Sequence, residues 1–91
     1  MIHRLICVTG RVQGVFFRAW TVEQAKALGI DGWVRNRADG SVEIRAAAPS
    51  EQMALFIARL HDGPPAARVD QVIDEEATAE PFDEFAQRAT V

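Results

Sequence analysis

The sequence predicts an α+β fold in which two helices pack on one face of an antiparallel sheet. Two segments carry apolar residues at the three- and four-residue spacing of amphipathic helices, at residues 17–28 and 50–60. Short β-prone runs separate them, and one run, residues 41–46, alternates strictly between apolar and polar residues. The chain has 91 residues, of which 48% are hydrophobic and 25% charged, so we expect one small globular domain.

The first strand is predicted from Arg4 to Val8, which is short, apolar and β-prone. Two glycines then mark a loop, Thr9 to Gly14. A helix is expected from Phe17 to Leu28, because apolar and small residues recur there at helical spacing. Gly29 is a plausible stop for that helix.

The next strand is predicted at Gly32–Asn36, and the Ala38-Asp39-Gly40 tripeptide is a hairpin turn signal. Val42, Ile44 and Ala46 then alternate with Ser41, Glu43 and Arg45. This pattern indicates a strand with the apolar residues buried and the polar residues facing water.

The second helix is expected to start near Pro49, with Ser50 as its N-cap. Its apolar stripe consists of Met53, Phe56, Ile57 and Leu60, the spacing of an ordinary core face. A strand is predicted from Arg68 to Ile73, a turn or irregular connection at 75–81, and a weaker strand at 82–88. This order fits a βαββαβ core, the ferredoxin-like α/β sandwich.

Charge and composition exclude several classes of function. The formal net charge of -3 and the pI of about 5.3 argue against a general nucleic-acid binder. The chain has no run near the roughly 18 apolar residues that cross a bilayer, so no membrane association is expected. A lone cysteine in an apolar run, Cys7, is predicted to be a buried core residue. We expect a cytoplasmic protein in a reducing compartment.

The segment Gly10–Arg18 joins a predicted strand to the start of a predicted helix. The first N–H groups of a helix lack internal partners and lie at the positive end of its dipole. Glycines let the preceding loop curl so that several N–H groups point inward, which makes an anion site. Arg18 in the first turn could add two parallel hydrogen bonds to phosphate oxygens. The alternative is a structural loop with a surface arginine.

Asn36 ends the second predicted strand, next to the turn. An amide at this position can orient a water molecule without taking its proton. It can equally cap the turn through its own backbone, which is a common role for asparagine.

Together the two segments resemble the acylphosphatase family. Its signatures, a GxVQGVxFR-type loop and a G-aromatic-V-x-N-x3-G-x-V strand-turn, stand here as GRVQGVFFR at 10–18 and GWVRNRADGSV at 32–42. AKALGI before the second motif and GPPAARVD after the second helix extend the resemblance over nearly the whole chain. The sequence departs from the family's pattern at Ala86-Gln87-Arg88, which is more polar than usual, and at Ala47-Ala48-Pro49, where many members have glycine.

The resemblance implies one domain over residues 1–91 that hydrolyses the carboxyl-phosphate bond of small acyl phosphates. It implies that Arg18 binds the phosphate and that Asn36 positions the attacking water. The cradle for the phosphate would be Arg11, Val12, Gln13, Gly14, Val15, Phe16 and Phe17. No cofactor or metal is indicated, the expected partner is the small-molecule substrate alone, and a monomer is the simplest expectation. The proton of the water would pass to the substrate's own phosphate, because no carboxylate or histidine near the motif is an obvious base.

A non-catalytic module of the same fold is the main alternative, one that binds phosphate or another anion or serves in regulation. The same kind of domain begins large carbamoyl-transfer proteins that mature hydrogenases, but this chain has no zinc-finger Cys pairs. The acidic pI counts against an RNA-binding domain. Trp20 and Trp33 are expected in the core or a pocket wall. The following arginines could steer anions at the pocket mouth or form solvated surface: Arg11, Arg35 and Arg37.

Overall fold

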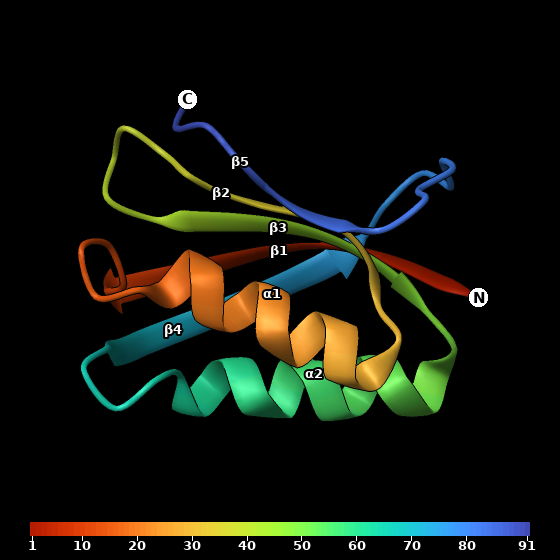
Figure 1. The fold of residues 1–91 in the computed structure, drawn as a ribbon, viewed down its shortest axis with the longest axis horizontal. Coiled ribbons are helices and arrows are strands. Elements are labelled where there is room, and N and C mark those ends of the chain that lie inside the picture. The colour runs from red at the N-terminus through yellow and green to blue at the C-terminus, as the bar shows by residue number, and fades with distance from the viewer.

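The computed structural model describes residues 1–91 and contains the seven elements in the predicted order (Figure 1). They are β1 (Ile2–Arg11), α1 (Phe17–Leu28), β2 (Asp31–Asn36), β3 (Val42–Ala48), α2 (Ser50–Asp62), β4 (Arg68–Glu76) and β5 (Phe85–Arg88). These helices and strands confirm the α+β prediction. Neither helix has the length and apolar character needed to cross a membrane.

The five strands form one sheet in the order β4-β1-β3-β2-β5. The prediction of an antiparallel sheet is correct for β1 to β4, whereas β5 runs parallel to β2. The direction of β5 follows from the connection that precedes it. That connection, residues 77–84, crosses from one edge of the sheet to the other at the end where β4 finishes and β2 begins (Figure 1). A strand entered from that end runs in the same direction as β2.

Both helices cover the same face of the sheet, and the core lies between the two layers (Figure 1). Ile6 and Val8 of β1 and Ile44 of β3 are fully buried on that face. They meet the apolar stripes of the helices, which supply the buried residues Phe17 and Ala25 from α1 and Met53, Phe56 and Leu60 from α2. The core therefore forms from the residues whose spacing predicted it.

Cys7 and Trp33 belong to the opposite, uncovered face of the sheet. Strand residues alternate between faces, so Cys7, between the buried Ile6 and Val8, points away from the helices and is only partly buried. The prediction that Cys7 is a core residue is therefore wrong. Trp33 is buried, but it is covered by the guanidinium groups of Arg35 and Arg88, 4.5 and 5.0 Å from its ring, and it does not belong to the core cluster.

The element boundaries agree best for the first helix. α1 spans the predicted residues, and Gly29 ends it in the left-handed conformation with φ 70°. The predicted N-cap of α2 is wrong by one position, because Pro49 occupies it and Ser50 is the first helical residue, without a capping side chain. β4 continues to Glu76 instead of ending at residue 73. Ser41, expected to face water, is buried, and both its N–H and its hydroxyl donate hydrogen bonds to Asp39 in the turn.

Candidate functional site

Residues 12–16, which we call the 12–16 loop, connect β1 to α1. Two of its residues, Gly14 and Phe16, have left-handed backbone conformations. Gly14 has φ 73°, which glycine adopts without strain. Phe16, the residue before the helix, has φ 62° and ψ 24°, a conformation that costs a non-glycine residue about 1–2 kcal/mol. No side chain caps the N-terminus of α1, and its first turn holds no acidic residue. The positive end of this helix is therefore open to an anion.

A cavity of about 230 Å³ opens at this helix end. The loop and the first turn contribute Val12, Gly14, Phe16, Phe17, Arg18 and Ala19, while Asn36 comes from the end of β2 and Gln87 from β5. Arg18 and Asn36, which are separate in sequence, thus line one cavity. Gln87 was not among the predicted site residues, although its place in an unusually polar last strand was a usable signal.

Arg18 is held by the backbone rather than by a carboxylate. Its Nη1 donates a hydrogen bond to the carbonyl oxygen of Arg88, over 3.1 Å, and it forms no salt bridge. A guanidinium has five N–H donors in a planar fork, so several stay free for an anion. The positive charge at the cavity is consequently not neutralised by the protein.

The Asn36 side chain does not cap the turn. Its Oδ1 is buried and has no hydrogen-bond partner within the protein. Asp39 takes the capping role instead, since its Oδ1 accepts hydrogen bonds from the hydroxyl of Ser41, at 2.6 Å, and from the Ser41 N–H, at 2.9 Å. These bonds, the hydroxyl bond foremost, lower the pKa of the Asp39 carboxyl, and the Arg37 charge acts in the same direction. Asn36 therefore lines the cavity as a residue whose amide oxygen, although buried, has no partner in the protein.

Gln13 braces the 12–16 loop against the β2–β3 hairpin. Its Nε2 donates to the carbonyl oxygens of Arg37, at 2.8 Å, and Ser41, at 2.9 Å. The loop that precedes Arg18 is thereby fixed to the hairpin that carries Asn36. Nothing in the sequence indicated that this side chain points to the hairpin rather than into the cavity.

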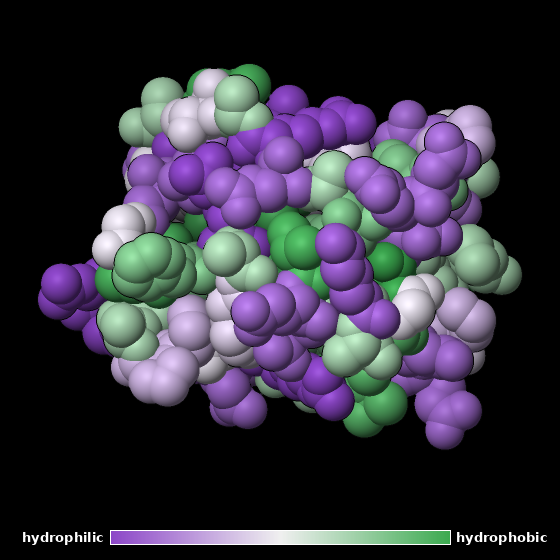
Figure 2. All heavy atoms as spheres, in the orientation of Figure 1, coloured by the Kyte–Doolittle hydropathy of each residue, from purple (hydrophilic) through white to green (hydrophobic).

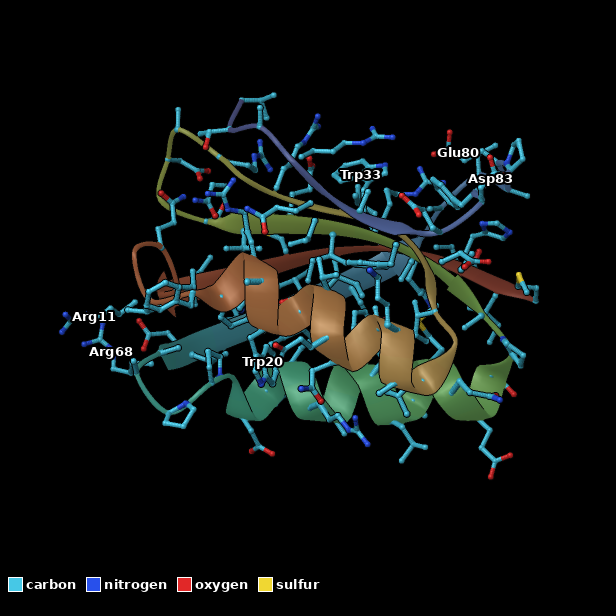
Figure 3. All side chains as sticks on the ribbon, viewed as in Figure 1. Arg11, Trp20, Trp33, Arg68, Glu80 and Asp83 are labelled. Carbon is cyan, nitrogen blue, oxygen red and sulfur yellow. The ribbon has the colours of Figure 1, made fainter.

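Three residues of the predicted phosphate cradle lie outside the cavity lining. Arg11 ends β1, is exposed and lies beside Arg68 at the rim of the molecule, outside the cavity lining (Figure 3). Gln13 and Val15 are also absent from the lining.

Arg35 and Arg37 both face Glu43, with N–O distances of 2.6 and 3.8 Å. Glu43 therefore pairs with both arginines that were considered for the pocket mouth, one negative charge against two positive ones.

Comparison with known proteins gives the same family at every level. The family model described as Acylphosphatase matches residues 5–87. An acylphosphatase from Rhizorhabdus wittichii is 56% identical over 90 residues, which cover 99% of this chain and 91% of that protein. The crystal structure of acylphosphatase from Bacillus subtilis superimposes with a TM-score of 0.94 at 35% identity, over 97% of this chain and 99% of that one. An acylphosphatase structure from Coxiella burnetii gives 0.92 at 36% identity, over 96% and 92% of the two chains.

Proposed function

The chain belongs to the acylphosphatase family, and from this premise we propose that Arg18 binds the phosphoryl group of the substrate while Asn36 positions the attacking water. The enzyme hydrolyses the carboxyl-phosphate bond of small acyl phosphates to a carboxylate and inorganic phosphate. The proposal assigns the backbone of residues 11–17, and chiefly of the 12–16 loop, to the cradle around the phosphoryl oxygens. The single observation that carries it is that Arg18 and Asn36 line one cavity, and that the buried Oδ1 of Asn36 has no partner in the protein.

Phosphoryl transfer needs charge stabilisation more than covalent help. In the transition state the charge spreads over three phosphoryl oxygens, and the free N–H groups of Arg18 and of the helix start are the donors beside them. The leaving group is a carboxylate, whose conjugate acid has a pKa near 4, so it departs without a proton.

The water attacks phosphorus from the side opposite the leaving group. In our proposal the Oδ1 of Asn36 accepts one hydrogen bond from this water and so fixes the direction of its lone pair. The new bond joins the water oxygen to phosphorus, and the bond from phosphorus to the acyl oxygen breaks. The cavity lining holds no carboxylate and no histidine that could take the proton. The water's proton therefore goes to a phosphoryl oxygen of the substrate.

A non-catalytic anion-binding module would need Arg18 and the helix end but no unpartnered amide beside them. The Asn36 side chain therefore favours hydrolysis over simple binding. We further propose that residues 1–91 act as one domain and as a monomer, because a single chain supplies every residue of the site. A cytoplasmic location suits the free thiol of Cys7. Light scattering and cell fractionation would test these two assignments.

The test is the hydrolysis of benzoyl phosphate by the wild type, Arg18→Ala and Asn36→Ala, with inorganic phosphate as a competitive inhibitor. Arg18→Ala should lower kcat/KM by about 10²–10³ and weaken phosphate inhibition. Asn36→Ala should lower kcat by a similar factor and leave phosphate inhibition unchanged, since its partner is the water. Arg68→Ala is the matched control, because it removes an exposed arginine whose ion pair, with Asp70, lies outside the cavity.

Two results would contradict the assignment. Wild-type turnover no faster than buffer would exclude the hydrolase. Full activity in Arg18→Ala, with the wild-type thermal unfolding curve, would exclude Arg18 as the phosphate ligand.

A further inference from the structure

A second, open hollow of about 450 Å³ adjoins the catalytic cavity, and we call it the acyl groove. Its walls include Val15 and Phe16 from the 12–16 loop, Trp20 from α1, and Pro64 and Pro65 from the connection between α2 and β4. In Figure 3 the Trp20 side chain lies on the side of α1 that faces α2. The proposed reaction leaves this groove without a role.

The groove adjoins the phosphate cavity, because Phe16 and Ala19 line both. A ligand with its phosphoryl group in the cavity can therefore extend over these two residues into the groove. The first turn of α1 lies between the β2–β3 hairpin and the α2–β4 connection (Figure 1). The phosphate cavity takes Asn36 from the hairpin side, and the acyl groove takes Pro64 and Pro65 from the connection. Asn36 lies on the hairpin side. In-line attack puts the leaving group opposite the water, which is the side of the groove.

Most of the groove lining is apolar, and part of it is held by packing and hydrogen bonds. Val15 and Pro64 are buried, and the Ala67 N–H donates to the Pro64 carbonyl oxygen at 2.9 Å, which closes the turn of the connection. The Trp20 ring packs on Phe17 with 5.4 Å between ring centroids. Figure 2 shows hydrophobic residues at the end of the molecule that carries the 12–16 loop, among hydrophilic ones, and further hydrophobic residues near the middle of the same face.

Phe16 supplies a second, independent indication of an apolar ligand. Its side chain is 85% exposed, so its ring gains little from packing in the free protein. Its left-handed backbone would suit glycine or asparagine better. A large exposed ring in a strained conformation, between two hollows, gives the fold no stability that explains its presence.

Glu23 is the one charged residue in the lining of the groove. It is exposed, lies one turn beyond Ala19 on α1, and forms no salt bridge. An acyl group that ends in a carboxylate would meet this charge in a groove without cations. A neutral ring or branched alkyl group would meet apolar walls instead.

We propose that the acyl groove binds the acyl group of the substrate and selects acyl phosphates with uncharged, apolar acyl groups over those that end in a carboxylate. This inference rests on the proposed function, because it takes the phosphoryl position from Arg18 and the attack direction from Asn36.

The test compares kcat/KM for benzoyl phosphate, acetyl phosphate and succinyl phosphate in the wild type and two variants. Ala66→Gln places a polar, uncharged side chain at the groove wall, and it should lower the benzoyl-to-acetyl ratio by about 3–10-fold, the worth of a displaced apolar contact. Glu23→Gln should raise the succinyl-to-benzoyl ratio about 3–5-fold, the effect of one exposed charge nearby. The intrinsic reactivity of each substrate cancels because the same ratios are compared between variants.

Ala27→Gln is the matched control, since Ala27 is an exposed position on α1 outside the groove, and its ratios should equal those of the wild type. Inhibition by inorganic phosphate reports on the cavity alone and should stay unchanged in every variant. Hydrolysis of all three substrates with wild-type ratios in Ala66→Gln and Glu23→Gln would overturn the groove and leave the hydrolase standing. No hydrolysis of any substrate by the wild type would overturn the proposed function, and the groove assignment with it.

Discussion

The guanidinium of Arg18 is bonded to the carbonyl oxygen of Arg88, a residue 70 positions further along the chain. The last strand therefore helps to orient the arginine that we assign to the phosphate. A carbonyl oxygen holds the guanidinium without cancelling its charge, as a carboxylate would. The position of β5 beside β2 is thus part of the site and not only of the sheet.

Arg18→Lys tests whether the forked geometry matters in addition to the charge. Lysine keeps the charge as a single point, but it loses the parallel pair of hydrogen bonds. The loss of one charge-assisted hydrogen bond, about 1.5–3 kcal/mol, corresponds to a decrease in kcat/KM of roughly 10–100-fold. Benzoyl phosphate hydrolysis measures the effect, with thermal unfolding as the control for folding. Wild-type activity in Arg18→Lys would show that the charge alone suffices.

Gln13→Glu should loosen the 12–16 loop. The carboxylate has the same shape but no donor, and it would face the carbonyl oxygens of Arg37 and Ser41. We expect the free energy of unfolding to fall by about 1–3 kcal/mol and the KM to rise, because two acceptors lose their donor. Urea unfolding and substrate saturation curves measure the two effects. Gln13→Ala, which adds no charge, should be milder, and equal losses in both variants would refute the repulsion.

Gly32→Ala should be among the most damaging single changes in the chain. Gly32 has φ 141°, and an added Cβ would lie 1.9 Å from the carbonyl oxygen of Arg45 on β3. We expect a loss of more than about 4 kcal/mol in the free energy of unfolding, because β2 and β3 would have to separate. The matched comparison is Gly29→Asn, where φ is 70° and no atom lies within 4 Å of the added Cβ. Denaturant unfolding of both should show a small effect in Gly29→Asn.

The Asp39 turn predicts a specific loss of stability in acid. The pKa of Asp39 is lowered in the fold below its ordinary 3.8, chiefly by the Ser41 hydroxyl bond. A lowered carboxyl pKa stabilises the fold above the ordinary value, and the contribution disappears as pH falls through the lower, folded-state pKa. The stability difference between the wild type and Asp39→Asn should therefore be constant at neutral pH and shrink in acid. A difference independent of pH would assign the effect to shape rather than charge.

The elements that depend on local pattern could be predicted from the sequence. Residues 17–28 carry helical spacing and end at Gly29, and α1 has those bounds. The exact end of β4 could not be predicted, because Asp74, Glu75 and Glu76 have no strand pattern of their own. They are ordered by pairing with β1, at Ile6, Leu5 and Arg4. The alternation of strand residues also predicts that Cys7 and Trp33 point to the opposite face from their neighbours in the strand. It does not tell which of the two faces the helices cover.

The residues of the site also differ in whether they could be predicted from local sequence. Arg18 and Asn36 stand in motifs, so their presence in one cavity could be expected from the family resemblance. Gln87 and the Arg88 carbonyl reach the site only because β5 pairs with β2, a contact between distant parts of the chain. The acyl groove likewise depends on how closely α2 and its following turn approach α1, and local patterns do not report that distance.

The backbone of Val91 is hydrogen-bonded to the strand end that bears Asn36 and to the turn after it. Its N–H donates to the Asn36 carbonyl oxygen at 3.1 Å, and its carbonyl oxygen accepts from the Ala38 N–H at 2.7 Å. The N-terminus lies at the far end of the molecule from the 12–16 loop (Figure 1). An affinity tag for purification or surface immobilisation therefore belongs at Met1, because a peptide fused behind Val91 would pull on the strand end that bears Asn36.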